Sequence, residues 1–169
     1  MGLLDTILSA GEGGIVNQLA SQFGVSGDQA TSALKTMIPA LAGGIQEKLS
    51  SGGSSTLSNL LCGGSLTRFA DDPASATSPA GIEQGKSLLG SIFGSQDLSG
   101  LTSSIAEKTG LGGNIIGKML PAVTTLLGGF LSKEAGGGTD KLTTCLTALT
   151  SEHQGILGAV KSMFAKLTG

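Results

Sequence analysis

Apolar residues recur at intervals of three and four along nearly the whole chain, which is the spacing of one face of an α-helix. The stretch 15–23 is a clear case, because Ile15, Leu19 and Phe23 share a face and Gly24 follows as a C-terminal stop. No segment alternates apolar and polar residues convincingly, as a half-buried strand would. The pattern therefore predicts an all-α protein.

Turn and capping residues divide this pattern into separate helices. Ser26 and Gln29 have the spacing of a capping box at the start of a long helix. Pro79 lies just before a later helix and indicates its entry, and Gly94 and Gly110 are placed as helix ends. The predicted helices run over 3–10, 15–23, 26–49, 56–62, 81–93, 98–109, 114–135, 140–150 and 155–167.

Two of the long predicted helices contain a proline within their apolar pattern. Pro39 and Pro121 lack the backbone N–H that an interior helical position uses, so we predict a kink at both. The apolar residues around these prolines are the candidates for a core or for an interface between chains. They are Met37, Ile38, Leu41, Ile45, Met119, Leu120, Val123 and Leu127.

The two halves of the chain share one order of elements: an amphipathic helix, a glycine stop, then a long helix with an internal proline and a glycine pair. KTMIPA over 35–40 is similar to KMLPA over 118–122. Between the halves, residues 64–80 are mostly small, polar and proline-flanked, which is typical of an exposed linker. We therefore predict an internal repeat of two related multi-helix units, 1–63 and 81–169, joined by a flexible linker over 64–80.

The N-terminal part of the chain resembles a known family. It begins MGLLD over 1–5, continues LASQFGVS over 19–26, and an Ala/Leu-rich helix then reaches PAL over 39–41. This order is similar to that of the YidB-like bacterial proteins of unknown function, most closely over 1–49 and more loosely over 98–135. The resemblance implies homeodomain-like packing of short helices in a cytoplasmic bacterial protein, and it carries no catalytic residues.

Composition and charge narrow the range of functions. Charged residues make up 13% of the 169, about half the usual ~25%, and the net charge is −2. Nucleic-acid binding needs clustered Lys and Arg, so no nucleic acid is expected as a partner. One His and two Cys are too few for a four-ligand His/Cys structural metal site. We expect no metal and no cofactor.

Two motifs invite an enzymatic interpretation, and each has a simpler one. AGIEQGKS over 80–87 is similar to a phosphate-binding loop, but no strand is plausible before it, so a helix start after Pro79 is favoured. Glu152 and His153 could supply a base, but no Gly-x-Ser-x-Gly nucleophile motif accompanies them. We therefore predict a protein that is not an enzyme.

The glycines and cysteines are candidates for structural roles. Gly81 and Gly85, and then Gly90 and Gly94, form two pairs of small residues four apart, which favour close approach of helices in a bundle. The two cysteines, Cys62 and Cys145, are interpreted as small buried apolar residues, and a disulfide between them stays open.

The function predicted from these patterns is that of a self-associating structural or interaction protein. Its apolar kinked helices would form a homo-oligomer or bind a protein partner, since a sparsely charged surface favours association. The alternative is a peripheral membrane or lipid-binding protein that uses the same helices, and a DNA-binding module is less favoured. The longest strongly apolar run, 119–132, is shorter than the ~20 residues of a membrane span, so no transmembrane segment is predicted. No basic stretch precedes the apolar N-terminus, which favours a cytoplasmic location.

Overall fold

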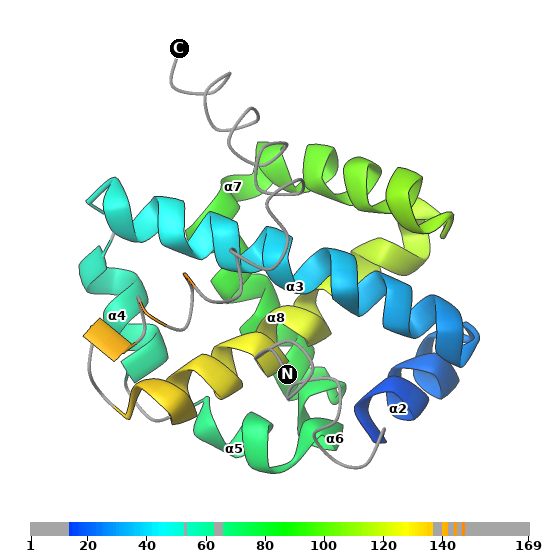
Figure 1. Ribbon diagram of the computed structural model, residues 1–169, viewed down its shortest axis with the longest axis horizontal. Helices are drawn as coiled ribbons and strands as arrows, with labels where there is room; N and C mark the ends of the chain where they lie inside the picture. Colours follow the sequence, from blue (N-terminus) through cyan, green and yellow to red (C-terminus); the bar gives the residue numbers. More distant parts are fainter. Residues whose placement is uncertain are drawn as a thin grey trace.

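The computed structural model describes residues 14–52, 54–62 and 66–136, together with positions 140, 141, 144 and 147. Every regular element within these residues is an α-helix, which confirms the all-α prediction (Figure 1). The predicted helices 3–10 and 155–167 lie outside the described residues, as do Cys145, Glu152 and His153. The described helices are α2 (Gly14–Phe23), α3 (Gly27–Ser50), α4 (Ser54–Cys62), α5 (Thr67–Asp71), α6 (Pro73–Ala76), α7 (Pro79–Thr109) and α8 (Gly113–Ala135).

The ends of these helices follow their capping residues. The Ser26 hydroxyl accepts a hydrogen bond from the Gln29 backbone N–H at 3.2 Å, and the Gln29 side chain accepts one from the Ser26 N–H at 3.1 Å. These two bonds complete the predicted capping box of α3. Gly24 and Gly110 adopt φ values of 69° and 71°, in the left-handed region that glycine occupies without steric cost. Both predicted helix stops are confirmed.

The main interruption of a long helix is a glycine and not a proline. Helices α3 and α8 continue past Pro39 and Pro121 as single elements, and the kinks remain a prediction. Helix α7 instead breaks at Gly94, whose φ of 71° and ψ of 175° lie far from helical values. This break, predicted as a helix end, divides α7 into a first half before Gly94 and a second half that ends at Thr109.

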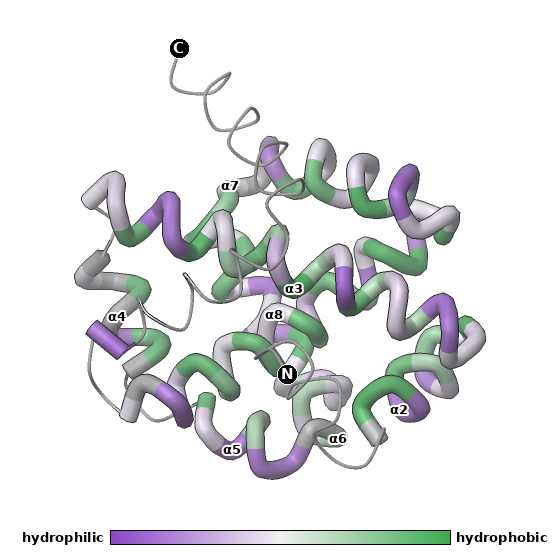
Figure 2. The backbone as a smooth tube through the Cα atoms, viewed as in Figure 1, coloured by the Kyte–Doolittle hydropathy of each residue, from purple (hydrophilic) through white to green (hydrophobic). Residues whose placement is uncertain are grey.

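Helix α8 is the centre of the fold. It contacts each of the other described helices, α2 to α7, and Figure 1 shows it crossing the middle of the molecule. Its residues are mostly apolar, as the green colour along much of its tube shows in Figure 2. The stretch Gly113–Glu134 is long and apolar enough to cross a membrane, but 78% of its most apolar window is buried inside the fold. That burial is what a core helix requires.

The segment predicted as a linker is part of this core. Leu66, Phe69 and Ala76 are buried, and two short helices, α5 and α6, cover most of the range 66–76. The expectation of an exposed linker is therefore wrong for these residues. The physical reason is the burial of Phe69 against α8, which outweighs the small and polar composition of its neighbours.

The two predicted units also share one hydrophobic core. Helices α3 and α4, from the first predicted unit, pack against α7 and α8, from the second. The close approach of α5 to α8 depends on Gly129, because a Cβ there would lie 2.6 Å from the Leu66 carbonyl oxygen and 2.9 Å from the Ala70 nitrogen. The described helices therefore pack as one body around α8.

Candidate functional site

The side chains predicted as core or interface are all core of a single chain. Each is 2% exposed or less, so a second copy could not contact it without opening the fold. The structure therefore uses them as a core, and their use as an interface between chains stays a prediction. These side chains are Met37, Ile38, Leu41, Ile45, Met119, Leu120, Val123 and Leu127.

The phosphate-loop motif forms the start of helix α7. Ser78 is its N-cap, with its hydroxyl accepting from the Gly81 N–H at 3.2 Å, and Pro79 occupies the first turn. The ammonium of Lys86 lies 3.3 Å from the carboxylate of Glu83 on the same helix. The favoured interpretation, a helix start, is confirmed.

One of the two glycine pairs mediates close packing of helices. A Cβ at Gly85 would collide with the Pro121 carbonyl oxygen of α8, and a Cβ at Gly81 would collide with backbone carbonyls of Ser75 and Ala76. A Cβ at Gly90 would meet nothing within 4 Å. The prediction of close approach thus holds for the first pair and not for the second, whose other member, Gly94, breaks the helix instead.

A buried hydroxyl group stabilises the same contact between α7 and α8. The Thr125 side chain of α8 donates a hydrogen bond to the Gly81 carbonyl oxygen of α7, over 2.5 Å, and lies 3.0 Å from the carbonyl oxygen of Pro121. Thr125 is fully buried. The first half of α7 is therefore held against α8 by backbone packing at Gly85 and by this bond one turn away.

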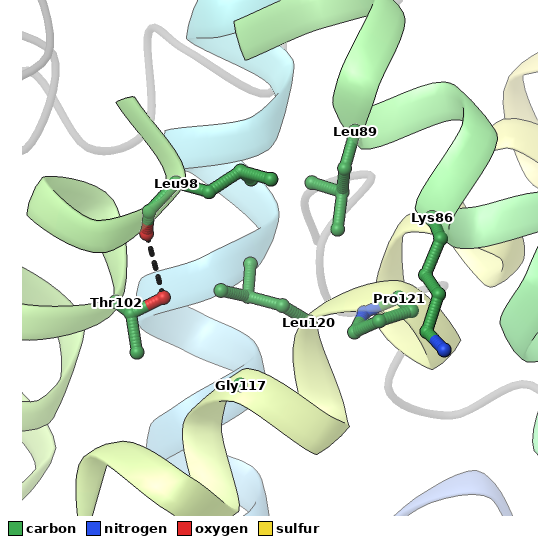
Figure 3. Close-up of a pocket in the computed structure, with 7 residues that line it drawn as sticks. All are labelled: Lys86, Leu89, Leu98, Thr102, Gly117, Leu120 and Pro121. Carbon is green, nitrogen blue, oxygen red and sulfur yellow. Dashed lines mark hydrogen bonds between the residues drawn. The ribbon is translucent and has the colours of Figure 1, made fainter. Parts of the chain in front are cut away.

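A pocket lies where both halves of α7 meet α8. Its volume is about 150 Å³, and Figure 3 shows leucine side chains from the three segments directed toward one another across it. The break at Gly94 is what allows both halves of α7 to border the same stretch of α8. The lining residues are Lys86 and Leu89 from the first half, Leu98 and Thr102 from the second, and Gly117, Leu120 and Pro121 from α8.

The pocket is mainly apolar, and the lining has few polar side chains. Leu89 and Leu120 are buried, while Lys86 lies at the edge with 60% of its side chain exposed. The Thr102 hydroxyl donates to the Leu98 carbonyl oxygen at 2.7 Å, as the dashed line in Figure 3 marks. Among the described residues, no group of three or more His, Cys, Asp or Glu side chains could hold a metal ion.

The sequence predicts no pocket, although it singles out two of the residues that line it. Leu120 is a core or interface candidate, and Pro121 is a predicted kink. Lys86, Leu98 and Thr102 were not connected with them, because nothing in a helical pattern says that two successive helices border one stretch of a third. The signal that could have pointed there is Gly94, since a glycine stop between two amphipathic helices permits a sharp return of the chain.

The fold and the pocket define a class: an all-helical domain packed around one central apolar helix, with a small apolar cavity beside it. Residues 5–134 match the family described as "Bacterial protein of unknown function (DUF937)". The chain belongs to this family, which is the one that its resemblance to the YidB-like proteins indicated. Neither the curated proteins nor the solved structures contain a match to this chain.

Proposed function

We propose that this protein is a non-enzymatic binding protein, and that the pocket between α7 and α8 receives a small apolar molecule. The observation that carries the proposal is the pocket of about 150 Å³ onto which Leu89, Leu98 and Leu120 converge. A cavity of about this size with an apolar lining binds benzene when it is engineered into another protein. A ligand of about six carbon atoms therefore matches the space.

The polar groups of the pocket support binding over catalysis. General acid–base or nucleophilic chemistry uses a nucleophile and a base within hydrogen-bond reach of each other. Thr102 directs its hydroxyl proton to the Leu98 carbonyl oxygen, and the Lys86 ammonium is exposed beside Glu83. Neither arrangement forms such a pair.

Burial of these helix faces supports a small ligand over the other functions predicted from the sequence. Self-association and membrane contact were both assigned to the apolar faces of the two proline-containing helices, and those faces are inside the fold. A small molecule that enters an existing pocket requires no such exposure. The proposed partner is therefore a small ligand and not a second copy of the chain.

The test is to fill the pocket with a side chain. Gly117 lies in the lining, and a Cβ there would meet nothing within 4 Å, so Gly117→Leu extends into open space. Leucine also favours a helix by roughly 0.8 kcal/mol over glycine, so the variant should fold. Gly90→Leu is the matched control, because Gly90 is equally open, is also helical and lies outside the lining.

Benzene is the probe, and backbone amide NMR shifts are the readout. We expect saturable shifts around Leu98 and Leu120 in the wild type and in Gly90→Leu, and loss of these shifts in Gly117→Leu. Absence of saturable shifts in the folded wild type would overturn the proposal, and so would benzene binding that Gly117→Leu leaves intact.

A further inference from the structure

We propose that the ligand of the pocket between α7 and α8 is a small amphiphile, an apolar chain of about six carbon atoms that ends in a carboxylate. The chain would lie among the leucines, and the carboxylate would pair with the ammonium of Lys86 at the pocket edge. The inference rests on the proposed function and names the class of ligand. Among the described residues that line the pocket, Lys86 is the one that carries a charge.

The lining of the pocket changes from buried to exposed. Leu89 and Leu120 are 3% and 2% exposed, so water has little access to their side of the pocket. Leu98 is half-buried, and the side chain of Lys86 is 60% exposed. A molecule in this pocket therefore meets an apolar surface at one end and solvent at the other.

The side chain of Lys86 is placed to serve the exposed end. Figure 3 shows it extending from α7 beside Pro121. A lysine side chain packs its apolar stem against such a surface while its ammonium stays in water. The four-carbon stem is also flexible, so an exposed ammonium can turn toward a charged group at the pocket edge. This position favours a ligand with a negative charge at its exposed end.

The partner of Lys86 within the chain does not prevent this pairing. The ammonium lies 3.3 Å from the carboxylate of Glu83, whose side chain is 74% exposed. An exposed ion pair of this kind is weak, because water and salt screen the two charges. Glu83 is outside the lining, and an ammonium has three N–H donors. Lys86 can therefore bind a ligand carboxylate in addition to Glu83 or in its place.

The exposed edge also admits a charge that the interior would exclude. An ionised carboxylate among the leucines would lose its hydration at a large free-energy cost, whereas at the edge it stays in contact with water. A neutral head group gains no ion pair with Lys86, and a cationic one is repelled by it. A chain with a single carboxylate therefore fits both ends of the site.

The experiment compares hexanoate with hexanol, two probes that have the same carbon chain and differ in charge. Lys86→Met keeps a long apolar side chain and removes the ammonium. Lys35→Met is the matched control, because Lys35 is exposed on α3, lies outside the lining and changes the net charge equally. Amide NMR titrations give both dissociation constants. We expect Lys86→Met to lower the ratio of hexanoate affinity to hexanol affinity about threefold, and Lys35→Met to leave this ratio as in the wild type.

A second variant and a change of salt test the same ion pair from other directions. Glu83→Gln removes the competing carboxylate, so it should raise the hexanoate-to-hexanol ratio about twofold. In the wild type, hexanoate affinity should fall as sodium chloride is raised to about 0.5 M, because salt screens the pairing with Lys86. Hexanol affinity should not fall with it.

The possible failures are distinguishable. An unchanged hexanoate-to-hexanol ratio in folded Lys86→Met would refute the inference, as would an equal drop in Lys35→Met or a hexanoate affinity that ignores salt. Hexanol binding in the wild type would in those cases leave the proposed function standing. Failure of both probes to bind the wild type would remove the function as well.

Discussion

Single glycines set how closely the helices of this protein approach, and their contacts differ even within one helix. Gly85 lies against the Pro121 carbonyl of α8, whereas Gly90 faces open space. The sequence predicts that some of these glycines permit close packing, because small residues four apart share a helix face. It does not say which pair meets a neighbour, since that depends on where α8 crosses α7.

Adding one methyl group at these two glycines should have opposite effects on stability. Gly85→Ala would place a Cβ into the Pro121 carbonyl, so we expect it to lower the free energy of unfolding by about 3 kcal/mol. Gly90→Ala adds a methyl in open space and improves helix propensity, so it should raise that free energy by about 0.5–1 kcal/mol. Urea unfolding followed by circular dichroism measures both. Equal effects of the two substitutions would contradict the packing described for Gly85.

At the scale of elements, the ends of most helices could be predicted and their partners could not. The capping box at Ser26 and the stops at Gly24, Gly94 and Gly110 rest on local backbone chemistry, which the sequence states directly. The two short helices over 67–76 were missed because their composition is small and polar. One aromatic residue, Phe69, holds that segment in the core through its burial against distant parts of the chain.

The break in α7 should depend on the backbone freedom of Gly94. An alanine at φ of 71° and ψ of 175° is strained, although nothing within 4 Å would obstruct its Cβ. We expect Gly94→Ala to lower the free energy of unfolding by about 1–3 kcal/mol through the backbone alone. Gly90→Ala, four residues earlier in the same helix, provides the comparison in the same urea experiment. A stabilising effect of Gly94→Ala would mean that α7 runs straight through this position.

At the scale of the whole molecule, the sequence predicts which apolar residues are buried. It does not predict whether they are buried within one chain or between chains. The eight apolar side chains proposed around the two prolines are all buried. Apolar stripes on a helix look the same in a sequence whether they face the rest of their own chain or another chain. Only the arrangement of all described helices around α8 shows that they are covered within one chain.

A charge inside this core should unfold the protein and not merely dissociate an assembly. Leu41 is fully buried, so Leu41→Glu would place a carboxylate in an apolar interior, at a cost of at least about 4–5 kcal/mol. We expect the variant to lose the helical circular dichroism of the wild type at 25 °C. Ser32→Glu, at an exposed position of the same helix, should keep it. A folded Leu41→Glu chain of lower mass by light scattering would instead restore the interface interpretation.

The central place of α8 has a consequence for how the chain is made. Every other described helix packs against α8, and α8 is the last long helix of the described chain. During synthesis at about 5–20 residues per second, the first helices leave the ribosome on the order of ten seconds before α8 does. During that interval, the helix faces that pack against α8 are exposed. A nascent chain stalled before α8 should therefore bind cellular chaperones, and these chaperones should dissociate when α8 emerges from the exit tunnel.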